Sequence, residues 1–164
     1  MSRRTPILLL LVCGLAMGSV ASAYWLIRTG RWTPANPSVA EYPVRGIDVS
    51  RHQGRIDWPE VAASGVDFVY MKATEGGDWT DPEFARNWRE AGAAGLTRGV
   101  YHFFTFCRDG DEQADHALGV LPPEAELPFA VDVEYGGNCQ GYESHEAILA
   151  SLDRFIERVT ASTG

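Results

Sequence analysis

The chain has 164 residues, a length typical of a single domain, of which 45% are hydrophobic and 22% charged, as in a folded protein. Its formal net charge is -8 at pH 7. This acidic balance argues against a nucleic-acid partner, because binding to a phosphate backbone depends on clustered lysine and arginine side chains.

Residues 1–27 are predicted to be a targeting segment outside the fold. Arg3 and Arg4 precede an apolar run, and residues 21–23 read Ala-Ser-Ala, the pattern of a signal-peptide cleavage site. The uncharged stretch over residues 5–27 is also long enough to cross a bilayer, so a cleaved signal peptide and a retained anchor both remain open. Either one predicts an exported protein, periplasmic or extracellular, that meets the membrane only through this segment.

The next stretch, residues 28–43, contains glycine and several prolines without hydrophobic periodicity, and we expect a linker there. From residue 44 to residue 164, strand and helix signals alternate. Strands are expected over residues 44–50, 68–77, 98–106 and 127–135. Helices are expected over residues 57–65, 81–95, 109–120 and 143–160, the first three with N-terminal caps at Asp57, Asp81 and Asp109. Strands joined through helices run parallel, which predicts an α/β domain.

Parallel strands place their C-terminal ends at one rim, where the active sites of α/β folds are built. The polar residues near these strand ends are therefore expected to converge: Asp48, Lys72, Glu75, Tyr101, His102, Asp132 and Glu134. Two cysteines, Cys107 and Cys139, also follow strand ends on neighbouring units. Because export permits disulfides, we predict a bridge between these two loops, with two free thiols as the alternative.

The strand signal over residues 130–135 contains two acids, Asp132 and Glu134. In a strand, side chains two residues apart leave the same face, with Cα atoms about 6.5 Å apart. Like charges so placed raise one another's pKa, which suits glycoside hydrolysis, where one carboxyl is protonated and another ionised. Glu134 would then donate a proton to the leaving oxygen, while Asp132 or Asp48 would stabilise the developing positive charge. The alternative is an edge strand whose acids only face water.

Other chemistries lack their sequence signals. There is no G-x-S-x-G nucleophile motif, no G-x-x-x-x-G-K-[ST] and no G-x-G-x-x-G phosphate cradle. Asp48, His52 or His102 with Asp132 would be the candidate metal ligands, but no H-x-H or H-E-x-x-H spacing supports them. The sequence therefore predicts neither a metal nor a cofactor.

Four segments, residues 46–58, 68–88, 99–104 and 130–134, resemble the successive motifs of the family 25 glycoside hydrolases, the lysozymes of the Chalaropsis and cellosyl type. The resemblance implies an irregular TIM-like β/α barrel and N-acetylmuramidase activity without a metal. Such an enzyme hydrolyses the β-1,4 bond between N-acetylmuramic acid and N-acetylglucosamine in peptidoglycan.

The family's catalytic glutamate matches Glu134, its paired aspartate matches Asp132 and its first-strand aspartate matches Asp48. The strand-three tyrosine, which lines the sugar subsite, matches Tyr101. His102, Glu75 and Lys72 are expected to contact the glycan strands beside them, in a monomeric protein.

The family's barrel has further strands, whereas only the first four βα units are recognised here, so the resemblance implies a partial, truncated catalytic domain over residues 44–164. A non-catalytic glycan-binding remnant is therefore an alternative function. An open, doubly wound domain, with its first strand beside the third, is the alternative fold.

Overall fold

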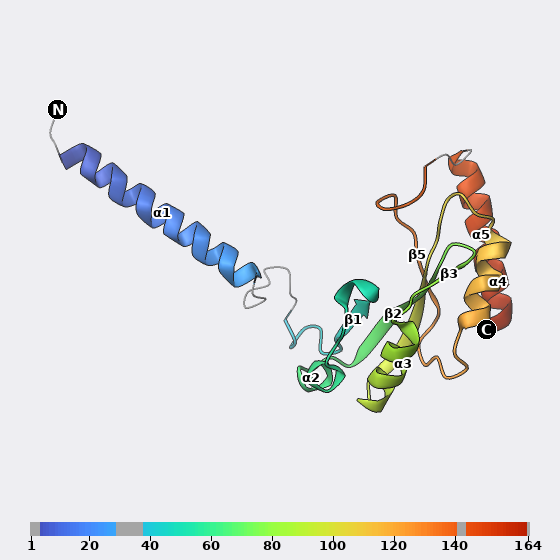
Figure 1. The fold of residues 1–164 in the computed structure, drawn as a ribbon. Helices are drawn as coiled ribbons and strands as arrows, with labels where there is room; N and C mark the ends of the chain where they lie inside the picture. The colour runs from blue at the N-terminus through green and yellow to red at the C-terminus, as the bar shows by residue number, and fades with distance from the viewer. Residues whose placement is uncertain (1–3, 29–37, 141–143, 164) are drawn as a thin grey trace. The chain divides into compact units, whose positions relative to one another are not determined.

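The computed structural model describes most of the chain, namely residues 4–28, 38–140 and 144–163 (Figure 1). It divides into two compact units, Met1–Pro43 and Val44–Gly164. The first unit contains one long helix, α1 (Arg4–Arg28). Among the described residues, no helix combines the length and the apolarity needed to cross a membrane. The signal peptide or anchor expected over residues 1–27 and the linker expected after it stay predictions.

The second unit is built on a mostly parallel sheet. Its main strands are β1 (Gly46–Val49), β2 (Phe68–Glu75), β4 (Thr97–Phe103) and β5 (Ala130–Asp132). They lie in the order β1-β2-β4-β5, and each neighbouring pair is parallel. The predicted strands are confirmed, although each is shorter than expected. Because β1 pairs with β2 and not with the third parallel strand, the strand order contradicts the doubly wound alternative.

A short strand that was not expected, β3 (Trp79–Thr80), pairs antiparallel with the end of β2. The chain reverses between the two strands through residues 76–78, where Gly76 has a φ of 56° that favours glycine. This hairpin brings Trp79 opposite Glu75 at the C-terminal end of the sheet.

The helical segments of this unit are η1 (Arg51–Gln53), α2 (Trp58–Ala63), α3 (Phe84–Ala93), α4 (Gly110–Val120) and α5 (His145–Thr163). The expected caps at Asp57 and Asp109 are confirmed, because each side chain accepts a hydrogen bond from a backbone N–H of the first turn. The start expected for the last helix, residue 143, lies outside the described residues.

The cap expected at Asp81 is wrong. Helix α3 begins at Phe84, and its preceding residue, Glu83, makes no side-chain capping bond. The Asp81 carboxylate instead accepts hydrogen bonds from the backbone N–H groups of Arg51 and Glu83, both at 2.8 Å. Asp81 is only 2% exposed, so this buried carboxylate ties the segment after β1 to the segment before α3.

Helices cover one face of the sheet, and two apolar clusters fill the interface. The first joins the sheet to α2 and α3 and contains Val49, Trp58, Val69, Met71, Ala73, Phe84, Trp88, Ala91, Leu96 and Val100. The second lies under α4 and α5 and contains Phe104, Ala114, Ala117, Ile148, Phe155 and Val159. Burial alternates along β2, where Val69 and Met71 are buried and Tyr70 and Lys72 are half-buried. The opposite face of the sheet, which we call the open face, is therefore partly accessible.

Two glycines shape the open face near the N-terminal ends of its strands. A Cβ atom added at Gly46 would collide with the Phe68 ring, and one added at Gly99 would collide with the Tyr70 ring. The two aromatic rings thus occupy the space above the neighbouring strands. The Tyr70 hydroxyl donates a hydrogen bond to the Pro128 carbonyl at 3.0 Å, which holds that ring in place.

Candidate active site

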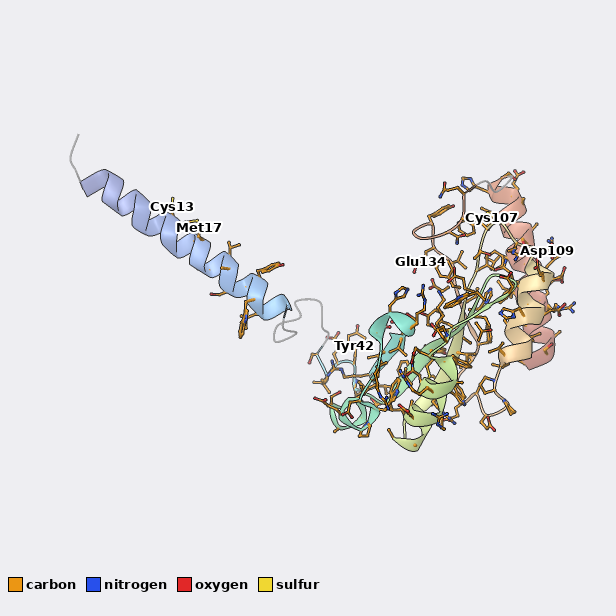
Figure 2. All side chains as sticks on the ribbon, in the orientation of Figure 1. Cys13, Met17, Tyr42, Cys107, Asp109 and Glu134 are labelled. Carbon is orange, nitrogen blue, oxygen red and sulfur yellow. A yellow bond between two sulfur atoms is a disulfide. The ribbon has the colours of Figure 1, made fainter. Side chains whose placement is uncertain are left out.

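The strand register brings the predicted polar residues together on the open face. Asp48 is aligned with Tyr70, Lys72 with Tyr101, and Phe103 with Asp132. Because aligned residues of parallel strands face the same side of a sheet, Asp48, Tyr101 and Asp132 share the open face. Glu134 follows two residues after the last residue of β5 (Figure 2).

Asp132 and Glu134 interact directly. The pKa of Asp132 is raised, first by burial, then by the negative charge of Glu134 and by a hydrogen bond with its side chain. The charge of Asp48 raises the pKa of Asp132 further, and the Lys72 ammonium opposes the increase. Asp132 therefore holds a proton more tightly than an isolated carboxyl would.

Both acids were expected inside one strand, and this expectation is wrong for Glu134. Strand β5 ends at Asp132, and the next residue, Val133, is 44% exposed. The carboxyls still meet, although Glu134 is carried by the loop that follows the strand. The position of Glu134 therefore depends on that loop and not on the pleat of the sheet.

Tyr101 lies among several carboxylates. Burial raises its pKa to about 12, and the charges of Asp48, Asp132 and Asp81 add to the increase, whereas a hydrogen bond with Ser50 lowers it. The phenol is consequently protonated at neutral pH and able to donate a hydrogen bond from the middle of the acid cluster.

The second strand contributes a cation and an acid. The Lys72 Nζ atom forms an ion pair with the Glu75 carboxylate at 2.7 Å. It also lies 4.5 Å from the centre of the Phe103 ring and 5.4 Å from that of the Trp79 ring. Trp79 was not among the predicted site residues, although Gly76-Gly77 after a strand signal favours a hairpin that would have placed this tryptophan at the rim.

His102 was expected to contact the substrate, and the structure contradicts this. It is fully buried between the sheet and the helices, and its ring stacks on Phe155 with centres 4.8 Å apart. Nδ1 lies 2.8 Å from the Thr74 hydroxyl, and Nε2 lies 3.2 Å from the Gln113 side-chain oxygen. Adjacent residues of a strand point to opposite faces, so Tyr101 on the open face forces His102 into the core.

The buried His102 is expected to make stability depend on pH. Burial is the main cause that lowers its pKa from 6.5 to about 4, so between these values the unfolded chain binds more protons than the folded chain. The free energy of unfolding should therefore fall as the pH is lowered through this window, by about 3 kcal/mol at its acid end. Urea unfolding at pH 7, 6, 5 and 4 measures the free energy of unfolding, and His102→Gln should make it less dependent on pH. Equal pH dependence in both proteins would mean that His102 is not the cause.

Two loops meet beside Glu134. The predicted disulfide between Cys107 and Cys139 is formed, with Cα atoms 6.2 Å apart, and it links the β4–α4 loop to the β5–α5 loop. Its neighbour Asn138 is buried and hydrogen-bonds to both loops. No signal in the sequence marked Asn138, because its role depends on contacts between segments 32 to 34 residues apart.

In the part of the chain that the structure describes, no group of three or more His, Cys, Asp or Glu residues is arranged to hold a metal ion. The rim presents paired carboxyls, a protonated phenol and a lysine beside aromatic rings.

The profile of the glycosyl hydrolases family 25 matches residues 47–164. The chain belongs to this family. Family 25 relatives include lysozyme M1 of Streptomyces globisporus, 40% identical over 128 residues that cover 73% of this chain and 43% of the relative. The N,O-diacetylmuramidase of Chalaropsis sp is 31% identical over 132 residues, 74% of this chain and 62% of the relative.

The fold agrees with this family. The structure of a family 25 glycosyl hydrolase from Bacillus anthracis superimposes with a TM-score of 0.67 at 33% identity, covering 73% of this chain and 56% of that chain. The chain spans about half the length of the curated relatives it matches.

Proposed function

We propose that this family 25 chain is a peptidoglycan N-acetylmuramidase, a lysozyme that hydrolyses the β-1,4 bond between N-acetylmuramic acid and N-acetylglucosamine. The observation that carries the proposal is the hydrogen-bonded pair of Asp132 and Glu134 on the open face of a sheet. Relatives named lysozyme and muramidase, and solved lysozyme structures of the same family, support it.

In this proposal the carboxyls have different roles. Glu134 is exposed and reaches solvent, so it is the proton donor to the leaving oxygen. Asp132 is half-buried beside it, and its raised pKa lets it supply the proton that Glu134 passes on through the hydrogen bond between the two carboxyls. Asp48 lies across the sheet on β1, and its negative charge stabilises the positive charge that develops on the sugar ring.

Other residues of the open face bind the sugar in this proposal. Tyr101 donates a hydrogen bond, Lys72 and Glu75 contact the polar groups of the glycan, and Trp79 extends the lining. We also propose that the four parallel strands are consecutive strands of the irregular β/α barrel found in this family, which the strand order supports. Peptidoglycan lies outside the cytoplasmic membrane, in agreement with the exported location predicted from residues 1–27 and with the disulfide.

Purified peptidoglycan sacculi test the proposed function. The chain is incubated with sacculi, and the soluble products are reduced with borohydride and analysed by mass spectrometry. New reducing ends on N-acetylmuramic acid are expected, since cleavage on this side of the muramic acid residue defines a muramidase. Reducing ends on N-acetylglucosamine would assign a different glycosidase. Binding to the sacculi without soluble products would favour the glycan-binding remnant.

A further inference from the structure

The side chain of Asn138 makes four hydrogen bonds beside the proposed active site. It is 9% exposed. Its amide nitrogen donates to the carbonyls of Phe104 and Glu134, at 2.8 and 3.0 Å. Its amide oxygen accepts from the backbone N–H groups of Phe106 and Cys139, at 2.9 and 3.0 Å. A primary amide offers two donors and two acceptor lone pairs, so this one is saturated.

These four bonds join the loop that carries Glu134 to the chain that leaves β4. Phe104 and Phe106 lie just past the end of β4, and the last bond between the two strand ends runs from the Phe104 N–H to the Asp132 carbonyl, at 2.9 Å. Glu134 lies beyond that bond. Beyond the end of the sheet, the Asn138 amide therefore links the two chain segments, because it donates a hydrogen bond to the Glu134 carbonyl.

The loop is built to return Asn138 to this position. Gly137 has a φ of 76°, a conformation that favours glycine, and the Asn138 N–H donates to the Tyr135 carbonyl at 3.4 Å. The chain thus turns back within four residues of Glu134. The disulfide at Cys139 ties the far side of the turn to Cys107 and leaves Glu134 itself untouched.

We propose that Asn138 is a positioning residue that holds Glu134 against Asp132. Its effect on hydrolysis rests on the proposed function, whereas its effect on the carboxyl pair does not. The disulfide links the β5–α5 loop to the β4–α4 loop, and the Asn138 amide fixes the position of the Glu134 backbone within the β5–α5 loop.

Replacing Asn138 with alanine tests the proposal through the titration of Asp132. Four ionisable groups face this carboxyl: Glu134 from its own segment, Lys72 from β2, Asp48 from β1 and Tyr101 from β4. Only Glu134 is held by Asn138. If the loop is released, the pKa of Asp132 should fall towards its ordinary value, because the charge and the hydrogen bond of Glu134 contribute to raising it. Carbon-13 NMR of the side-chain carboxyls measures this in the oxidised full chain, whether or not the chain hydrolyses peptidoglycan.

Asn87→Ala is the matched control, since Asn87 is another buried asparagine, 2% exposed, on α3. It should leave the titration of Asp132 unchanged even if it lowers stability. With active protein, Asn138→Ala should lower kcat by about 10- to 100-fold with a smaller effect on KM, because a displaced proton donor mainly affects the chemical step. Asn87→Ala should change kcat by less than about twofold, because Asn87 lies on α3, which covers the face of the sheet opposite to the open face.

A second comparison separates the amide from the disulfide. In Cys107→Ser/Cys139→Ser, the Asn138 bonds remain, so Asp132 should titrate as in the parent chain. An unchanged titration in Asn138→Ala would overturn the proposal, and so would a shift found only in the double cysteine variant. If the parent chain releases no muropeptides but Asn138→Ala shifts the titration, the proposed function fails and the positioning role stands.

Discussion

Replacing Glu134 with glutamine is expected to lower the release of soluble muropeptides by about 10²- to 10⁴-fold, the usual contribution of a general acid. Glutamine keeps the size of the side chain, but its amide cannot deliver a proton to the leaving oxygen. Glu134 is exposed, so the exchange leaves the core intact. Product release from sacculi, quantified by chromatography over several hours, measures the effect.

Glu124→Gln provides the control for this experiment. Glu124 is exposed and precedes β5, so it lies in a loop at the end of the sheet opposite to the proposed site, and the same change of charge there should leave activity unaltered. Binding of Glu134→Gln to sacculi should persist in a pelleting assay. If Glu134→Gln retains more than a tenth of the parent activity, another residue is the proton donor.

Replacing Phe155 with alanine is expected to lower the free energy of unfolding by about 3 to 5 kcal/mol. Phe155 is 1% exposed on α5. Its ring stacks on His102 and packs edge-on against Phe104 with centres 5.6 Å apart, and it also contacts Phe129. Truncation removes these contacts and leaves a cavity between α5 and the sheet, which chemical denaturation followed by circular dichroism would detect.

Leu149→Ala is the matched substitution on the same helix. Leu149 lies on α5 as Phe155 does, but it is 59% exposed. Its replacement should change the free energy of unfolding by no more than about 0.5 to 1 kcal/mol. Equal losses in the two variants would mean that α5 does not pack on the sheet as described.

The order of elements was predictable because each strand and helix has its own local signal. Apolar runs marked the parallel strands, and Asp57 and Asp109 marked two helix starts. The convergence of Asp48, Tyr101 and Asp132 followed from topology alone, since parallel strands end at one rim. These inferences needed no knowledge of any contact between distant side chains.

The errors arose where a local pattern has two structural explanations. Asp81 before Pro82 has the pattern of a helix cap, but its carboxylate is used between two loops. The assignment of both Tyr101 and His102 to the site conflicts with the alternation of side chains along a strand. Two adjacent strand residues point to opposite faces, so only one of them can lie at the site. Asn138 could not be found, because only the folded chain brings its four partners together.

Gly46 and Gly99 have a consequence for how a ligand would meet the sheet. Because the Phe68 and Tyr70 rings fill the space above these glycines, carbon-rich surface occupies the half of the open face where the strands begin. Lys72, Tyr101 and Asp132 lie nearer the strand ends, whereas Asp48 is level with Tyr70. Polarity thus changes along the strand axis. An elongated ligand with one apolar end and one polar end would therefore bind this sheet in one orientation, with its apolar end over the Phe68 and Tyr70 rings.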